Sequence, residues 1–234
     1  PGHAKQLPEV AAAAERAAER VGRFAADEGD AGKHLVFVGV PGPQTSQWYG
    51  DGYSGVGAAA SRPIPDGQHR DRGAPCTSSE TLLRADALAK LDLDFTLTWH
   101  LALGAACVGV PEHDRGNWWL LEGIREYAAQ GDRDPTTVVR KSDLRAVLSS
   151  WSGELTELYP LNARNSDQEW RHQQTAYAAV SRLVERYGER EFIAFFNAVG
   201  RKGTDYEKAA AQHLGASLSQ VQSDLNAYLR SLAG

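Results

Sequence analysis

The stretch Trp118-Trp-Leu-Leu-Glu-Gly-Ile-Arg-Glu-Tyr-Ala128 carries the most specific pattern in this chain of 234 residues. We predict a helix over Trp118–Gln130. Glu122 and Glu126 stand four residues apart, so a helix places their carboxylates on the same side. The stretch therefore presents a pair of acidic side chains on one side of a helix.

The chain before this stretch is predicted to contain a small sheet and a strongly apolar helix over Leu93–Cys107. The run His34–Val40 is β-branched and aromatic and stops at a Pro-Gly-Pro sequence, which is typical of a buried strand. Other expected elements are an amphipathic helix over Leu7–Ala26, a weaker strand or hairpin within Trp48–Ile64, a strand over Ser79–Arg84, and loops at Pro65–Pro75 and Pro111–Gly116.

The chain after this stretch is predicted to be helical. The expected helices are one opened by Pro135 and reaching about Ser150, Asp167–Tyr187 ended by Gly188, Glu189–Val199, Tyr206–Leu214, and a last one capped by Ser217. Strands first and helices second indicate an α+β fold. We expect one domain over residues 1–234: a sheet portion (1–91) packed on the Leu93–Cys107 helix, a pair of site helices (92–130) and a helical lobe (131–234).

Three stretches together resemble the gluzincin metallopeptidases of the peptidase-MA type, which have the zincin fold. They are Thr81–Leu91, Leu97-Thr-Trp-His-Leu-Ala-Leu-Gly-Ala105 and Trp118–Ala128. In that family an edge strand leads into a helix bearing His-Glu-x-x-His, and a later helix reads roughly Trp-Leu-x-Glu-Gly-x-x-Glu-Tyr. The resemblance covers roughly residues 34–232 and implies a zincin-like α+β fold.

The family's pattern has a chemical reason. Histidines at i and i+4 bind zinc from one helical face, the adjacent glutamate activates a metal-bound water, and a glutamate of the later helix is the third ligand. The resemblance places Glu122 at this third-ligand position. It places Glu126 at the acidic position that supports a ligand histidine.

The first helix departs from the family motif. One register aligns His-Glu-x-x-His with Trp99–Leu103, so both histidines and the general base are lost. The other aligns it with His100–Gly104, which keeps His100 but puts Leu101 in place of the base and Gly104 in place of the second histidine. Neither register contains a general base, so catalytic residues and bound metal are not expected.

Each candidate residue also has an ordinary structural interpretation. Glu122 and Glu126 are then a helical charge pair, with Glu122 turned outward or paired with a basic residue such as Arg125. A glutamate buried without partners would be costly or become protonated. His100 is then a satisfied core or cleft histidine. Trp99, Trp118, Trp119 and Tyr177 either line a cleft or pack in the core.

Composition bears on partners and location. The net charge is −5 with scattered basic residues, which argues against nucleic acid, and no apolar run reaches the ~18 residues of a membrane span. Cys76 and Cys107 could form one disulfide or remain two buried thiols. The chain begins at Pro1 and contains no methionine, which we interpret as a processed or partial sequence. With the family resemblance, this predicts an extracellular or cell-surface location.

The sequence therefore predicts a catalytically inactive, metallopeptidase-like domain without a cofactor. It would be a binding or structural module of an exported protein, with a peptide, a protein or a cell-envelope component as partner. The alternative is a zinc metallopeptidase with the non-standard ligand set His100, His113 and Glu122.

Overall fold

The computed structural model describes residues 4–24, 33–40, 58–65, 76–106, 117–158, 166–201 and 203–234. The chain divides into two compact units, residues 1–108 and 109–234, and each is described by itself. The described residues are mostly helical with a small sheet, so the predicted α+β class is confirmed. The predicted single domain spans both units, and their boundary falls between the two predicted site helices.

The sheet of the first unit has three strands in the order β1-β3-β2. Strand β1 (Lys33–Gly39) pairs in parallel with the central strand β3 (Cys76–Arg84), with His34 opposite Ser79. Strand β2 (Ala59–Pro65) pairs antiparallel with β3, with Ser61 opposite Thr81. The two stronger predictions are confirmed as strands, but the expectation that His34–Val40 is buried is wrong: β1 lies at an edge of the sheet, and its Leu35 is 47% exposed. The weaker one is realised from Ala59 onward, and its earlier part lies outside the described residues.

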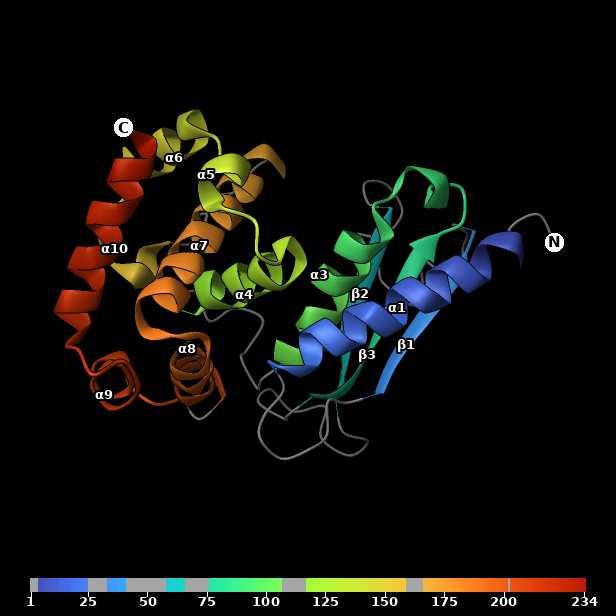
Figure 1. Cartoon of the computed structure of the whole chain (residues 1–234), viewed down its shortest axis with the longest axis horizontal. Helices are drawn as coiled ribbons and strands as arrows, with labels where there is room; N and C mark the ends of the chain where they lie inside the picture. Colours follow the sequence, from blue (N-terminus) through green and yellow to red (C-terminus); the bar gives the residue numbers. More distant parts are fainter. Residues whose placement is uncertain are drawn as a thin grey trace. The chain divides into compact units, whose positions relative to one another are not determined.

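Two helices accompany this sheet (Figure 1). Helix α3 (Leu93–Ala106) packs on β2 and β3, as predicted for the apolar helix, and α1 (Leu7–Gly22) packs along α3. The predicted first helix extended to Ala26, but α1 ends at Gly22, and Arg23 and Phe24 form a turn with Phe24 buried. A short 3-10 turn at Leu88–Lys90 connects β3 to α3. The buried stripe of α1 consists of Val10, Ala13, Ala17 and Val21.

The described part of the second unit contains helices and no strand. Helix α4 packs against α7, which in turn packs against α6, α8 and α10. The helices are α4 (Trp118–Gln130), α5 (Pro135–Val138), α6 (Lys141–Leu148), α7 (Ser166–Tyr187), α8 (Glu189–Phe196), α9 (Tyr206–Ala209) and α10 (Leu218–Ala233). A 3-10 turn at Leu155–Glu157 and wider π-helical turns at Asn197–Arg201 and Ala210–Leu214 complete the unit.

The prediction of a continuous helix from Pro135 to about Ser150 is wrong. The chain is extended at Val139 and Arg140, with ψ angles of 124° and 130°, and this break separates α5 from α6. A physical reason lies in the run Thr136-Thr-Val-Val139, because four consecutive β-branched residues disfavour a helix. Two predicted helix boundaries in this unit are confirmed. Gly188 ends α7 with a φ of 93°, and Ser217 caps α10 in a reciprocal capping box with Gln220.

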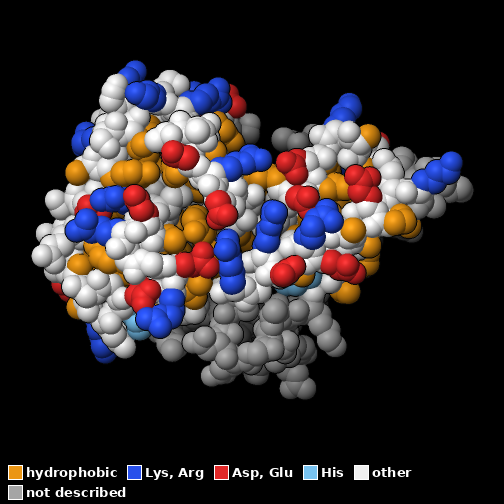
Figure 2. Space-filling view, viewed as in Figure 1, with side chains coloured by type: hydrophobic (Ala, Val, Ile, Leu, Met, Phe, Trp, Pro, Cys, Tyr) orange, Lys and Arg blue, Asp and Glu red, His pale blue; other side chains and the backbone are white. Residues whose placement is uncertain are grey.

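No described helix combines the length and the apolar character that crossing a membrane requires. On the face shown in Figure 2, acidic and basic side chains are interspersed rather than gathered by sign. This distribution agrees with the scattered charges of the sequence.

Candidate functional site

Helices α4 and α7 approach each other closely at Gly123. A Cβ atom added to Gly123 would lie 2.5 Å from Cγ2 of Val180 and 2.7 Å from the carbonyl oxygen of Ala176. Only a residue without a side chain fits this crossing. The close contact brings the neighbouring positions Glu122 and Glu126 next to α7, where both are buried.

Glu122 has an internal partner for each carboxylate oxygen. Glu122 is only 6% exposed. The Nη1 atom of Arg125 donates to Oε1 at 2.6 Å, and Nε2 of Gln173 on α7 donates to Oε2 at 3.2 Å. Pairing with Arg125 was one of the two alternatives for this residue and is confirmed. The other, in which Glu122 turns outward, is wrong because the α4–α7 contact encloses it.

Glu126 lies one turn further along the same buried layer and has different partners. It is 4% exposed, and its Oε2 atom accepts from Nε2 of Gln174 at 3.3 Å and from Nε2 of Gln130 at 3.4 Å. Burial raises the pKa of Glu126, and the hydrogen bonds from the two amides oppose that rise only in part. Two neutral amides thus hold an acid that is hard to ionise.

His100 belongs to the first unit, where it faces the sheet from α3. It is 9% exposed, and its Nδ1 atom lies 2.9 Å from the hydroxyl of Ser61 on β2. The ring of Trp99 meets it edge-on at 4.8 Å between centroids. Leu101, at the position of the general base in one register, is buried in the core. The surroundings of His100 match the interpretation as a satisfied histidine.

The four candidate aromatic residues separate into two groups. Trp119 and Tyr177 are 0% exposed and belong to the core, so they do not line an open cleft. The hydroxyl of Tyr177 donates to the carbonyl oxygen of Arg133 at 2.7 Å, and burial raises its pKa. Trp99 and Trp118 are half-buried. Trp118 meets the ring of His172 edge-on at 6.4 Å.

One candidate ligand and one candidate disulfide partner lie outside the described residues. His113 and Cys107 are not among the described residues, so the alternative ligand set and the disulfide with Cys76 stay predictions. Within the described residues, no three side chains of His, Cys, Asp or Glu form a group that could hold a metal ion. His100 and Glu122 lie in different units, and each has been described within its own unit.

Gln173 and Gln174 are the site residues that the sequence analysis missed. Both stand on α7, about 50 positions after the glutamates that they bind. A signal existed, because the two amide side chains stand just before Thr175 and the run Ala176–Val180 of the same helix. The partner they would meet could only be known from the α4–α7 crossing.

The chain matches no known protein-family model, and its sequence finds no match among characterised proteins.

Proposed function

We propose that this chain is a catalytically inactive, gluzincin-like domain that acts as a binding or structural module. The observation that carries the proposal is the pairing of Glu122, at the family's third-ligand position, with Arg125 at 2.6 Å. In this arrangement a fixed guanidinium stands where the resemblance expects a metal cation. Gln173 holds the second oxygen of the same carboxylate.

Electrostatics opposes a metal at this carboxylate. A divalent cation bound to Glu122 would meet the positive charge of Arg125 in a buried place, where screening by water is weak. Displacing Arg125 would leave a buried guanidinium without its anion, which typically costs about 3–5 kcal/mol. Glu122 therefore serves the α4–α7 packing better than it would serve as a ligand.

Proton transfer is also poorly supported in the part of the first helix that is described. In one register the general-base position holds Leu101, a buried aliphatic residue that cannot accept a proton from water. In the other register that position holds His100, whose Nδ1 already faces the hydroxyl of Ser61. On this proposal, the partner is a peptide, a protein or a cell-envelope component met outside the cell.

Zinc titration of the chelator-treated protein tests the proposal. We expect isothermal calorimetry to detect no stoichiometric zinc binding at micromolar concentrations, and an unstructured fluorogenic peptide to stay intact with zinc present. Glu122→Ala and the exposed control Glu169→Ala should behave like the parent chain. Stoichiometric zinc binding that Glu122→Ala abolishes, together with zinc-dependent cleavage, would establish the non-standard peptidase instead.

A further inference from the structure

A pocket of about 460 Å³ opens in the second unit at the end of α4 that is remote from Trp118. Its walls come from the end of α4, the turn into α5, the C-terminal part of α7 and one residue of α10. This volume falls within the usual range of small-ligand sites, roughly 300–1,000 Å³. Glu122 and Glu126 do not line it. The charged and aromatic residues that line it are Tyr127, Asp132, Arg133, Asp134, Glu185 and Tyr228.

Negative charge exceeds positive charge in this pocket. Three carboxylates line it, from Asp132, Asp134 and Glu185, against the one guanidinium of Arg133. Asp132 is exposed and makes no hydrogen bond or ion pair with the described residues. Asp134 uses Oδ1 to cap α5 through the amide of Thr136 at 2.8 Å. Arg182 pairs with Glu185. When Arg182 is counted as well, the three carboxylates exceed the two guanidinium groups by one negative charge.

The backbone adds to this negative potential. Helix α4 ends at Gln130, and Gly131 in the pocket wall closes it in a conformation with a φ of 62°. The last carbonyl groups of a helix carry partial negative charge and favour a nearby cation. Tyr228 also lines the pocket, and burial first and then the charges of Glu185 and Asp134 raise its pKa.

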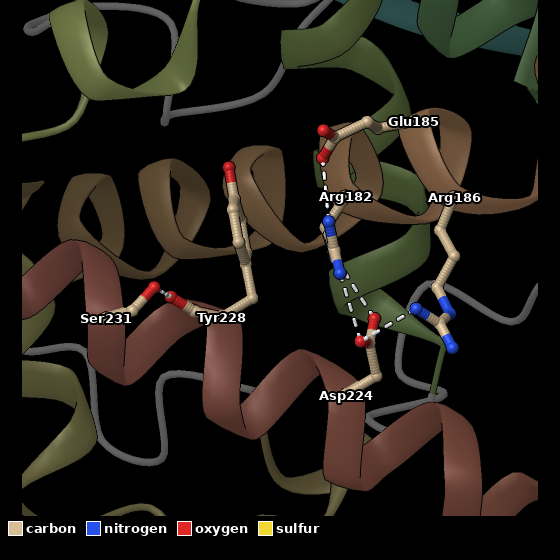
Figure 3. A network of polar contacts seen from close by, with 6 residues as sticks. All are labelled: Arg182, Glu185, Arg186, Asp224, Tyr228 and Ser231. Atoms are coloured by element: carbon tan, nitrogen blue, oxygen red, sulfur yellow. Dashed lines mark hydrogen bonds and ion pairs between the residues drawn. The ribbon is translucent and has the colours of Figure 1, made fainter.

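One guanidinium of the chain is already held beside this pocket in a way that a ligand could repeat. Figure 3 shows Arg182 between the carboxylates of Glu185 and Asp224. Its Nη1 lies 3.0 Å from Oε2 of Glu185, and its Cζ lies 5.2 Å from the centre of the Tyr228 ring. Carboxylates together with an aromatic face are a recurrent environment for guanidinium groups. Tyr127 and Asp132 give the pocket the same two kinds of group, an aromatic ring and a carboxylate.

We propose that this pocket binds a ligand bearing a guanidinium group, such as an arginine side chain of a peptide or a small guanidine. The carboxylates and the carbonyl end of α4 attract the positive charge, and the tyrosine rings and Val184 contact the hydrocarbon stem. The proposal goes beyond the proposed function, because it requires neither a metal nor α3. Zinc titration and guanidinium binding therefore succeed or fail separately.

Calorimetry with Nα-acetyl-arginine N-methylamide tests the proposal, and the citrulline analogue is the neutral control of the same shape. Because exposed ion pairs each contribute little, we expect a Kd of roughly 1 mM for the arginine compound. We expect binding at least tenfold weaker for the citrulline compound, and weaker arginine binding as salt is raised. Equal affinity for both compounds, or no binding of either at tenfold higher concentration, would overturn the proposal.

Variants connect the binding to the pocket. Asp132→Asn removes an exposed carboxylate without breaking a described contact, and it should weaken arginine binding about threefold, as expected for one exposed pair. The control Glu169→Gln removes the same charge from the other end of α7, roughly 24 Å from Glu185 along the helix axis, and should leave the Kd unchanged. Identical Kd values for both variants and the parent chain would place the binding elsewhere and refute the assignment.

The two ligand sources are separated by adding the peptide acetyl-Ala-Arg-Ala-amide. Tighter binding of this peptide than of the single residue would identify a peptide as the source. Equal or weaker binding would identify a small guanidine. Either result supports the guanidinium site itself.

Discussion

Glu122 and Glu126 are two buried acids of α4 with different nearest partners. Both occupy one face of α4 against α7, and both are nearly excluded from water. Glu122 faces a guanidinium, whereas Glu126 faces the amides of Gln130 and Gln174. A cation stabilises a carboxylate far more than a neutral donor does. Burial is the first cause of the raised pKa of Glu126, and the hydrogen bonds from Gln130 and Gln174 offset it only in part.

The raised pKa makes stability depend on pH at Glu126. Since the folded chain holds this proton more tightly than the unfolded chain, the free energy of unfolding falls as pH rises from about 4.3, the usual pKa of a glutamate, through the raised pKa. Glu126→Gln removes this dependence. In urea unfolding, we therefore expect the free energy of unfolding of the variant to rise relative to that of the parent chain over this pH range, by at most about 1.4 kcal/mol per pH unit.

The carboxylates outside this layer titrate alike in both proteins, so the difference between the two unfolding curves isolates Glu126. Glu122 and Arg125 are the charged groups that also act on it. A difference that stays constant from pH 4 to pH 8 would mean that Glu126 has an ordinary pKa in the folded chain.

At the scale of elements, the α4–α7 pair positions the whole polar layer. The crossing depends on Gly123, because a methyl group there would meet a backbone oxygen of α7, which cannot rotate away. The helices must then separate, and the hydrogen bonds from Gln173 and Gln174 to the two glutamates lengthen. Overpacking of this kind typically costs about 1–3 kcal/mol.

Gly123→Ala should accordingly lower the free energy of unfolding by about 1–3 kcal/mol, measured in urea. Gly22→Ala at the end of α1 is the matched control, because a Cβ there meets nothing within 4 Å. The control should be neutral or stabilising by up to about 1 kcal/mol, since alanine favours a helix more than glycine does. If the two substitutions had the same effect, the close crossing of α4 and α7 would be refuted.

Elements were predictable from sequence where local signals agreed with the tertiary contacts. Helix α4 has the predicted bounds, and Gly188 and Ser217 mark the expected helix ends. The break at Val139 was not predicted. Pro135 is a typical helix start, but the β-branched run after it disfavours the continuation of that helix. The partner of Glu122 within its own helix, Arg125, was foreseen. Its partner Gln173 was not, because local periodicity says nothing about which helix crosses α4.

At the scale of the whole molecule, the division into two units separates the halves of the predicted site. His100 belongs to the sheet unit and the two glutamates to the helical unit. The sequence predicts a loop at Pro111–Gly116, close to this boundary, but a loop alone does not show that one compact unit ends there and another begins. The described secondary structure of each unit packs mainly within that unit: α1 and α3 with the sheet, and α4 with α7.

Because the helical unit has its own core, we expect residues 109–234 to fold without the rest of the chain. Trp119, Tyr177 and Phe192 are fully buried there, and a chain of this length can exclude enough apolar surface from water to be stable alone. The fragment should show helical circular dichroism and one cooperative thermal transition. Its transition should shift down by several degrees with Gly123→Ala, as a loss of about 1–3 kcal/mol implies for this size. A broad transition that Gly123→Ala leaves unmoved would show instead that the helices depend on residues 1–108 for their packing.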